Sequence, residues 1–201
     1  MSDDFFQHKA AVYEQDERRV ANVHTIAGSI IKRIALKPTM QLMDFGSGTG
    51  LLLGQIASHV AKITAVDISK SMNQQLRDKK DSLACEVEVL EMDLCSTDLD
   101  RKFDGIISSM TMHHVEDVSA MFEKFRTLLK PGGFIAIADL ETEDGSFHTE
   151  DTGVFHKGFD GQALVDFATN AGFKQAEVGL ASTVHKPQGE YPVLLLTATI
   201  D

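Results

Sequence analysis

The fold of this chain is decided by the stretch Met40-Gln41-Leu42-Met43-Asp44-Phe45-Gly46-Ser47-Gly48-Thr49-Gly50. An apolar run leads into three alternating glycines, which let the backbone turn sharply and approach a ligand closely because no Cβ stands in the way. The leucine-rich segment after Gly50 begins a helix whose free N–H groups point back at that ligand. Strand, glycine loop and helix in this order predict a cofactor loop in an α/β fold.

A carboxylate follows at the end of the next apolar run, in Ala65-Val66-Asp67-Ile68-Ser69. Asp67 comes about twenty residues after the glycines, the distance at which βαβ nucleotide sites hold a ribose hydroxyl. The dinucleotide pattern G-x-G-x-x-G fails because Leu51 occupies its third glycine position, and no Gly-Lys-Ser/Thr of a Walker loop follows. The sequence therefore predicts an adenosine cofactor without phosphates.

Further motifs stand in a fixed order: Met92-Asp93-Leu94, then Phe103 to Met110, then a Pro131-Gly132-Gly133 turn before an apolar run. Together with the glycine loop and Asp67, this set resembles the class I S-adenosylmethionine-dependent methyltransferases from about residue 38 to the C-terminus, and within them the small-molecule, ubiquinone-biosynthesis-like branch. The resemblance implies an enzyme that moves the methyl group of S-adenosylmethionine to a small-molecule acceptor by direct displacement, with S-adenosylhomocysteine as product. A protein methyltransferase and a non-catalytic S-adenosylmethionine-binding protein are the alternatives.

The same resemblance implies roles for individual residues. The glycine-loop backbone meets the methionine end of the cofactor, Asp67 binds the ribose diol, and Asp44 reaches the ammonium group. A carboxylate accepts two hydroxyl hydrogen bonds and apolar walls suit a purine face, so chemistry agrees with these roles. The predicted cofactor-binding residues are Tyr13, Asp44, Gly46, Ser47, Gly48, Gly50, Asp67, Ile68, Met72, Asp93, Leu94, Ser109 and Met110.

Two adjacent histidines, His113 and His114, follow the fourth predicted strand. Ligands of open α/β sheets bind beyond the carboxyl ends of the strands, so these side chains are expected near the acceptor. Either histidine is a candidate general base or a residue that shapes the acceptor pocket. The sequence slightly favours the pocket role, because transfer from a sulfonium needs alignment more than proton transfer. No histidine pair has the spacing of a metal site, so no metal is predicted.

The coarse pattern predicts a doubly wound, Rossmann-like sheet that is mostly parallel. An amphipathic helix is expected over residues 17–36 within a helical lead-in of residues 1–36, and the half-polar run 86–89 is expected at a sheet edge. Runs 173–184 and 191–200 predict a C-terminal antiparallel hairpin. The expected N-caps of three helices are Ser69, Asp117 and Asp160. Residues 140–159 lack periodicity but carry aromatic side chains, which favours a lid over the acceptor.

Composition agrees with one enzyme domain over residues 1–201. The 201 residues are 43% hydrophobic, and the formal net charge is −11, which disfavours a nucleic-acid partner. No apolar run approaches the ~20 residues that span a bilayer, and the N-terminus lacks a signal-peptide pattern, so no membrane insertion is expected. Cys85 and Cys95 show no metal spacing and are expected as buried or half-buried reduced thiols, which favours a cytoplasmic protein. The oligomeric state is left open.

Overall fold

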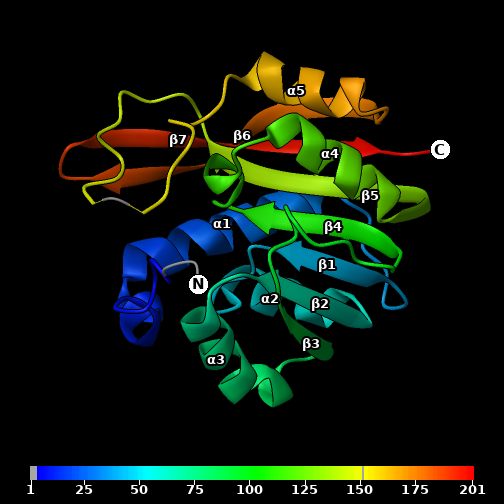
Figure 1. Ribbon diagram of the computed structural model, residues 1–201, viewed down its shortest axis with the longest axis horizontal. Helices are drawn as coiled ribbons and strands as arrows, with labels where there is room; N and C mark the ends of the chain where they lie inside the picture. The colour runs from blue at the N-terminus through cyan, green and yellow to red at the C-terminus, as the bar shows by residue number, and fades with distance from the viewer. Residues whose placement is uncertain (1–3, 151) are drawn as a thin grey trace.

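The computed structural model, which describes residues 4–150 and 152–201, contains a seven-stranded sheet in the order β3-β2-β1-β4-β5-β7-β6 (Figure 1). Strands β1 to β5 pair in parallel, and β7 is antiparallel to both β5 and β6. This confirms the mostly parallel α/β sheet with a C-terminal antiparallel hairpin. The strands are β1 Gln41–Phe45, β2 Lys62–Asp67, β3 Glu86–Glu91, β4 Phe103–Ser109, β5 Leu129–Leu140, β6 Lys174–Lys186 and β7 Gly189–Thr199.

Helices cover both faces of the sheet, as a doubly wound fold requires. Side chains of α1 and α2 belong to the core on one face, and those of α4 and α5 belong to the core on the other. The helices are α1 Glu17–Arg33, α2 Leu51–Ile56, α3 Lys70–Lys79, α4 Val118–Thr127 and α5 Gly161–Asn170, with short 3₁₀ turns η1 Ala10–Gln15, η2 Ala57–His59, η3 Lys80–Ser82 and η4 Met112–His114.

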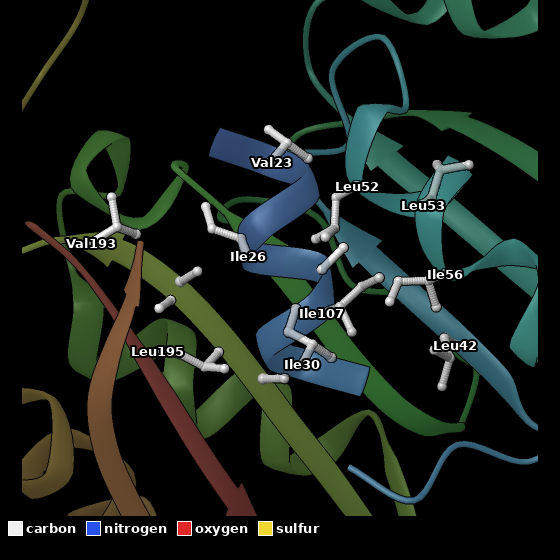
Figure 2. Close-up of a cluster of buried hydrophobic side chains, with 14 of the residues drawn as sticks. Val23, Ile26, Ile30, Leu42, Leu52, Leu53, Ile56, Ile107, Val193 and Leu195 are labelled. Atoms are coloured by element: carbon white, nitrogen blue, oxygen red, sulfur yellow. The ribbon is translucent and has the colours of Figure 1, made fainter. Parts of the chain in front are cut away.

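The central strands carry apolar side chains on both faces because each face of the sheet packs against a core. In β4, Ile106 packs into the core under α4 and α5, and Ile107 packs into the core under α1 and α2. Figure 2 shows Ile26 and Ile30 of α1 in the same buried cluster as Ile107 of β4. Packing on both faces holds the carboxyl ends of β1 and β4 in place, where the chain turns into its functional loops.

Local signals in the sequence place the helix starts correctly. The Ser69 hydroxyl accepts a hydrogen bond from the Met72 N–H, and the carboxylates of Asp117 and Asp160 likewise accept N–H bonds from the first turns of α4 and α5. The half-polar strand β3 is at a sheet edge, as expected. These caps confirm that Ser and Asp before apolar periodic segments mark helix starts here.

Other expectations need correction. Helix α1 ends at Arg33 rather than residue 36, because Ile34 already has an extended backbone with φ −107° and ψ 125°. The residue before a proline disfavours helical geometry, so the helix ends ahead of Lys37-Pro38. Both cysteines are free, but Cys95 is exposed rather than buried or half-buried, since it follows β3 in a surface turn. No helix of the described chain is long and apolar enough to cross a bilayer.

The 140–159 segment, of which residue 151 lies outside the described residues, runs beside the carboxyl end of the sheet (Figure 1). Its two ends meet in an isolated parallel bridge between Glu141 and Phe159. Gly158 has φ +75°, and a Cβ there would lie 2.2 Å from the carbonyl oxygen of Glu141. Only glycine fits this crossing, which closes the segment at its base. Residues 1–3 of the predicted lead-in also lie outside the described residues.

Candidate functional site

A cavity of about 930 Å³ opens at the carboxyl ends of the parallel strands. Its walls include the glycine loop, η4, the start of α1, residues 147–150, 152 and 155 of the irregular segment, and the tip of the β6–β7 hairpin. Every predicted cofactor residue lines it except Gly50. Gly50 precedes α2 with φ +87°, and a Cβ there would lie 2.6 Å from a methyl carbon of Leu76. That glycine serves the turn and its packing, not the cavity wall.

The glycine loop is tied to the neighbouring strand by backbone hydrogen bonds. The N–H groups of Gly46 and Ser47 both donate to the Val66 carbonyl oxygen, at 2.8 and 3.2 Å. The Gly48 N–H donates to Oδ2 of Asp67 at 2.7 Å, and the Ser69 N–H donates to its Oδ1 at 2.7 Å. Burial raises the pKa of Asp67 in spite of these bonds. The loop and the predicted ribose carboxylate therefore form one unit.

Unpartnered polar atoms gather around the loop. Asp44 is 1% exposed, and its Oδ2 has no hydrogen-bond partner among the described residues. Burial, and secondarily the charge of Asp67, raise the pKa of Asp44 well above its usual range. Buried polar groups in proteins are normally satisfied, so such a group marks a place for a ligand. The other unpartnered atoms on the cavity wall at this end are the Asn22 Oδ1, Ser47 Oγ, Thr49 Oγ1 and Ser109 Oγ.

The two histidines lie on η4, which follows β4, and the structure gives them different surroundings. His113 is 1% exposed, and its Nδ1 lies 2.6 Å from Oδ1 of the fully buried Asp139. The second oxygen of Asp139 accepts the His113 backbone N–H at 3.2 Å. Burial alone raises the pKa of Asp139, but charge attraction to His113 and these hydrogen bonds hold it below its usual value. Asp139 is therefore ionised and fixes the imidazole ring.

Two further rings complete a histidine cluster, defined here as His113, His114 and His148. Their ring centroids are 4.2 Å (His113–His114), 5.1 Å (His113–His148) and 5.9 Å (His114–His148) apart. Burial first, and then the charge of His113, lower the pKa of both His114 and His148 to about 4. The Nε2 atom of His148 is buried without a partner in the described structure. His114 and His148 therefore present neutral rings to the cavity, and His148 has hydrogen-bonding capacity left over.

Comparisons with known proteins agree with this geometry. Residues 43–137 match a sequence model described as a methyltransferase domain. An uncharacterized methyltransferase of Schizosaccharomyces pombe is 26% identical over 194 residues, covering 88% of this chain and 68% of that protein. Phosphoethanolamine N-methyltransferase 1 of Zea mays is 28% identical over 186 residues, covering 85% of this chain and 36% of that protein. An uncharacterized methyltransferase of Mycobacterium tuberculosis is 27% identical over 123 residues, and the chain spans 60% of its length.

Solved structures share the fold over nearly the whole chain. A chain from the complex between the Haloferax volcanii Trm112 methyltransferase activator and its methyltransferase superposes with a TM-score of 0.80 at 18% identity, covering 99% of both chains. Haemonchus contortus phosphoethanolamine N-methyltransferase 2 in complex with S-adenosyl-L-methionine gives a TM-score of 0.71 at 18% identity, covering 98% of this chain and 59% of that chain.

The comparisons support a class I S-adenosylmethionine-dependent methyltransferase, with the methyltransferase domain model matching residues 43–137. S-adenosylmethionine is accordingly its cofactor.

Sequence reasoning missed several residues of this methyltransferase site. Asp139 closes the apolar run that follows the Pro131-Gly132-Gly133 turn, and its place at the end of a strand beside β4 was a usable signal. Asn22 on α1 reads as a surface residue of an amphipathic helix. Arg18 and Lys186 reach the cavity from α1 and from the hairpin tip, which no local pattern indicates.

Not every aromatic or histidine of the 140–159 segment faces the cavity. Phe147 lines it and is buried, whereas Phe155 lines it but is 57% exposed. Phe159 packs into the core under α4 and α5, and His156 Nε2 lies 2.9 Å from the Val115 carbonyl oxygen. Among the described residues, no group of three or more His, Cys, Asp or Glu side chains is arranged to hold a metal ion.

The low pKa values of the cluster predict that acid destabilises this methyltransferase. The unfolded chain binds protons at His114 and His148 below pH 6.5, but the folded chain does so only near pH 4. Stability is therefore lost as the pH falls from 6.5 towards 4. Because His148 is only half-buried and solvent screens it, we expect the pair to account for about 2 kcal/mol of the loss.

Urea unfolding at several pH values tests this, with His114→Gln as the variant and the exposed His24→Gln as the matched control. The variant should lose less stability than the wild type between pH 6.5 and 4, and the control should behave as the wild type. Parallel curves for all three proteins would contradict the assignment.

Proposed function

We propose that this methyltransferase acts on a small-molecule acceptor by direct displacement. The observation that carries the proposal is the continuity of one cavity from the glycine loop to the histidine cluster, beneath the 147–155 residues. Ligand sites for small molecules are enclosed, partly apolar cavities of this size. The relatives named above include methyltransferases of phosphoethanolamine, and a magnesium protoporphyrin IX methyltransferase of Synechocystis has a similar fold at a TM-score of 0.66. Assignment to the ubiquinone-biosynthesis-like branch stays a prediction.

Cofactor binding is assigned to the loop end of the cavity. Asp44 would accept the ammonium group with its free Oδ2, and the unpartnered oxygens of Asn22 and Ser47 lie on the same wall. The second lone pairs of Asp67 remain for the ribose hydroxyls after its two backbone bonds. Bound S-adenosylmethionine supplies a methyl group on a sulfonium, whose leaving group is neutral.

We assign to His113 the role of accepting the proton that the methyl acceptor loses. Ionised Asp139 can only accept hydrogen bonds, so Nδ1 of His113 donates to it, and in the tautomer that this bond selects Nε2 is the free acceptor. Because His113 lines the cavity, its Nε2 is suited to orient an O–H or N–H nucleophile and to take its proton. The buried hydrogen bond between His113 and Asp139 therefore favours His113 as a general base over a histidine that only shapes the pocket.

A screen of small-molecule acceptors for S-adenosylhomocysteine release tests the proposed function. Turnover of a small acceptor, abolished by competition with S-adenosylhomocysteine, would support it. Methylation of a protein substrate alone would favour the alternative of a protein methyltransferase. Tight cofactor binding without turnover of any acceptor would favour a non-catalytic binding protein.

The ribose assignment predicts that Asp67→Ala weakens cofactor binding. A lost hydrogen bond to a charged group is worth roughly 1.5–3 kcal/mol, which corresponds to about a ten- to hundredfold rise in Kd. Calorimetric titration of S-adenosylhomocysteine measures this, with Asp98→Ala as a control carboxylate that is exposed and does not line the cavity. Equal affinity in Asp67→Ala and wild type would refute the assignment.

A further inference from the structure

The cavity wall carries groups of both charges. Asp44 and Asp67, which are buried or half-buried, belong to the predicted cofactor site. Where α1 begins and the hairpin turns, the wall holds the basic side chains of Arg18, Arg19 and Lys186, together with one carboxylate, Asp16, which both arginines contact. In a chain with a formal net charge of −11, this local excess of cations needs an explanation.

Lys186 is the most informative of the three. It lies at the end of β6, and its ammonium donates to the Phe147 carbonyl oxygen at 2.5 Å and lies 3.5 Å from the Phe147 ring centroid. No carboxylate of the described residues forms an ion pair with it. Burial first, and then the charges of Arg19 and Arg18, lower the pKa of Lys186, and the carboxylates of Asp16 and Glu143 offset this only in part. An anion placed here would relieve that repulsion.

The guanidinium groups of Arg18 and Arg19 differ in how many contacts they already make within the protein. Arg19 stacks over the Tyr13 ring at 4.0 Å, its Nη1 donates to the Tyr13 carbonyl oxygen at 2.6 Å, and its Nη2 lies 3.6 Å from Oδ2 of Asp16. Within the described residues, the Arg18 side chain makes one ion-pair contact, a long one of 3.7 Å from Nε to Oδ1 of Asp16, and it is 64% exposed. The guanidinium of Arg18 is therefore free to form the bidentate pair that suits a carboxylate or phosphate.

The acceptor would lie between these cations and the histidine cluster. Phe147 and His148 stand next to each other on the cavity wall, with ring centroids 4.8 Å apart, and Phe147 also contacts Lys186. The unpartnered Nε2 of His148 offers one more polar contact on the same wall. An acceptor with a flat or apolar middle and an anionic end matches this sequence of groups.

We infer that Arg18 and Lys186 form a binding site for an anionic group, a carboxylate or a phosphate, on the methyl acceptor. This inference rests on the proposed function, because it names the class of acceptor that the same cavity takes. The anionic end is held at the hairpin tip, and the nucleophile of the acceptor extends from there towards His113. Arg18 and Lys186 determine specificity; they do not touch the reacting atoms.

Calorimetric titration of the protein loaded with S-adenosylhomocysteine tests the inference without knowledge of the natural acceptor. The probes are benzoate, phenyl phosphate and benzamide, which is the neutral isostere of benzoate. Wild type should bind at least one anion about tenfold more tightly than benzamide, and Lys186→Gln and Arg18→Gln should each remove most of that preference. The tighter of the two Kd values, for benzoate or for phenyl phosphate, shows whether the site prefers a carboxylate or a phosphate.

Lys174→Gln is the matched control, because Lys174 starts the same strand at its far end and does not line the cavity. It should bind the probes as wild type does. Equal binding of benzoate, phenyl phosphate and benzamide, or anion binding unchanged in both cavity variants, would overturn the inference. Failure of the proposed function would look different: the anions would bind as expected, but no small acceptor would release S-adenosylhomocysteine.

Discussion

His113→Ala is expected to lower kcat by roughly 10²–10⁴ on any turned-over acceptor, since this is the usual contribution of a general base. Affinity for S-adenosylhomocysteine should stay within a few-fold of wild type, because His113 lies at the acceptor end of the cavity. Asp139→Asn should also lower kcat, because the amide no longer selects the tautomer with the proton on Nδ1. Both effects are measured by steady-state kinetics at saturating cofactor.

The neighbouring His114 supplies the control. Its Nδ1 contacts the Gly153 carbonyl oxygen and its ring borders the same cavity, but no carboxylate of the described residues is hydrogen-bonded to its ring. His114→Ala should therefore raise KM and largely retain kcat, because it removes contacts that bind the acceptor equally in the ground state and the transition state. If His113→Ala also changed only KM, the histidine would shape the pocket and the proton-accepting role would be wrong.

Asp44→Asn is expected to raise the Kd of S-adenosylmethionine more than a hundredfold. The substitution keeps the shape but removes the charge that faces the ammonium of the cofactor, and loss of one partner of a buried pair costs about 3 kcal/mol or more. Because the pKa of Asp44 is raised, its carboxylate fraction increases with pH. Wild-type affinity should therefore rise as the pH increases, and the variant should lose that contribution.

Asp104→Asn is a suitable control for the same titration, since Asp104 lies at the start of β4, pairs with Lys130 and is outside the cavity. NAD should not bind either protein, because Leu51 breaks the dinucleotide register. Unchanged cofactor affinity in Asp44→Asn would show that the ammonium lies elsewhere.

The fold was predictable because its signals are local. Glycine register, capping side chains and two-sided apolar runs depend on neighbours in the chain, and Ser69, Asp117 and Asp160 all cap helices where expected. The end of α1 was missed by three residues because helix ends depend on weak balances of backbone energy. The 3₁₀ geometry of η1 has no sequence signal of its own.

Site residues that directly follow a strand could be predicted from the sequence. Site residues that meet only through tertiary contacts could not. The glycine loop, Asp67 and His113 belong to motifs that the parallel sheet brings to one edge. The pairing of His113 with Asp139 depends on how β4 and β5 align, Ser109 opposite Ala138. The approach of Lys186 to Arg18 depends on a hairpin that extends past α1, and no spacing rule encodes that meeting.

Transfer of a tritiated methyl group from S-adenosylmethionine tests the central claim most directly. The protein is incubated with the labelled cofactor and a cell extract, and the products are separated into small molecules and macromolecules by ultrafiltration. We predict label in a small-molecule product, lost with His113→Ala and with excess S-adenosylhomocysteine. Label found only in protein or nucleic acid, or a small-molecule product formed equally by His113→Ala, would contradict this account.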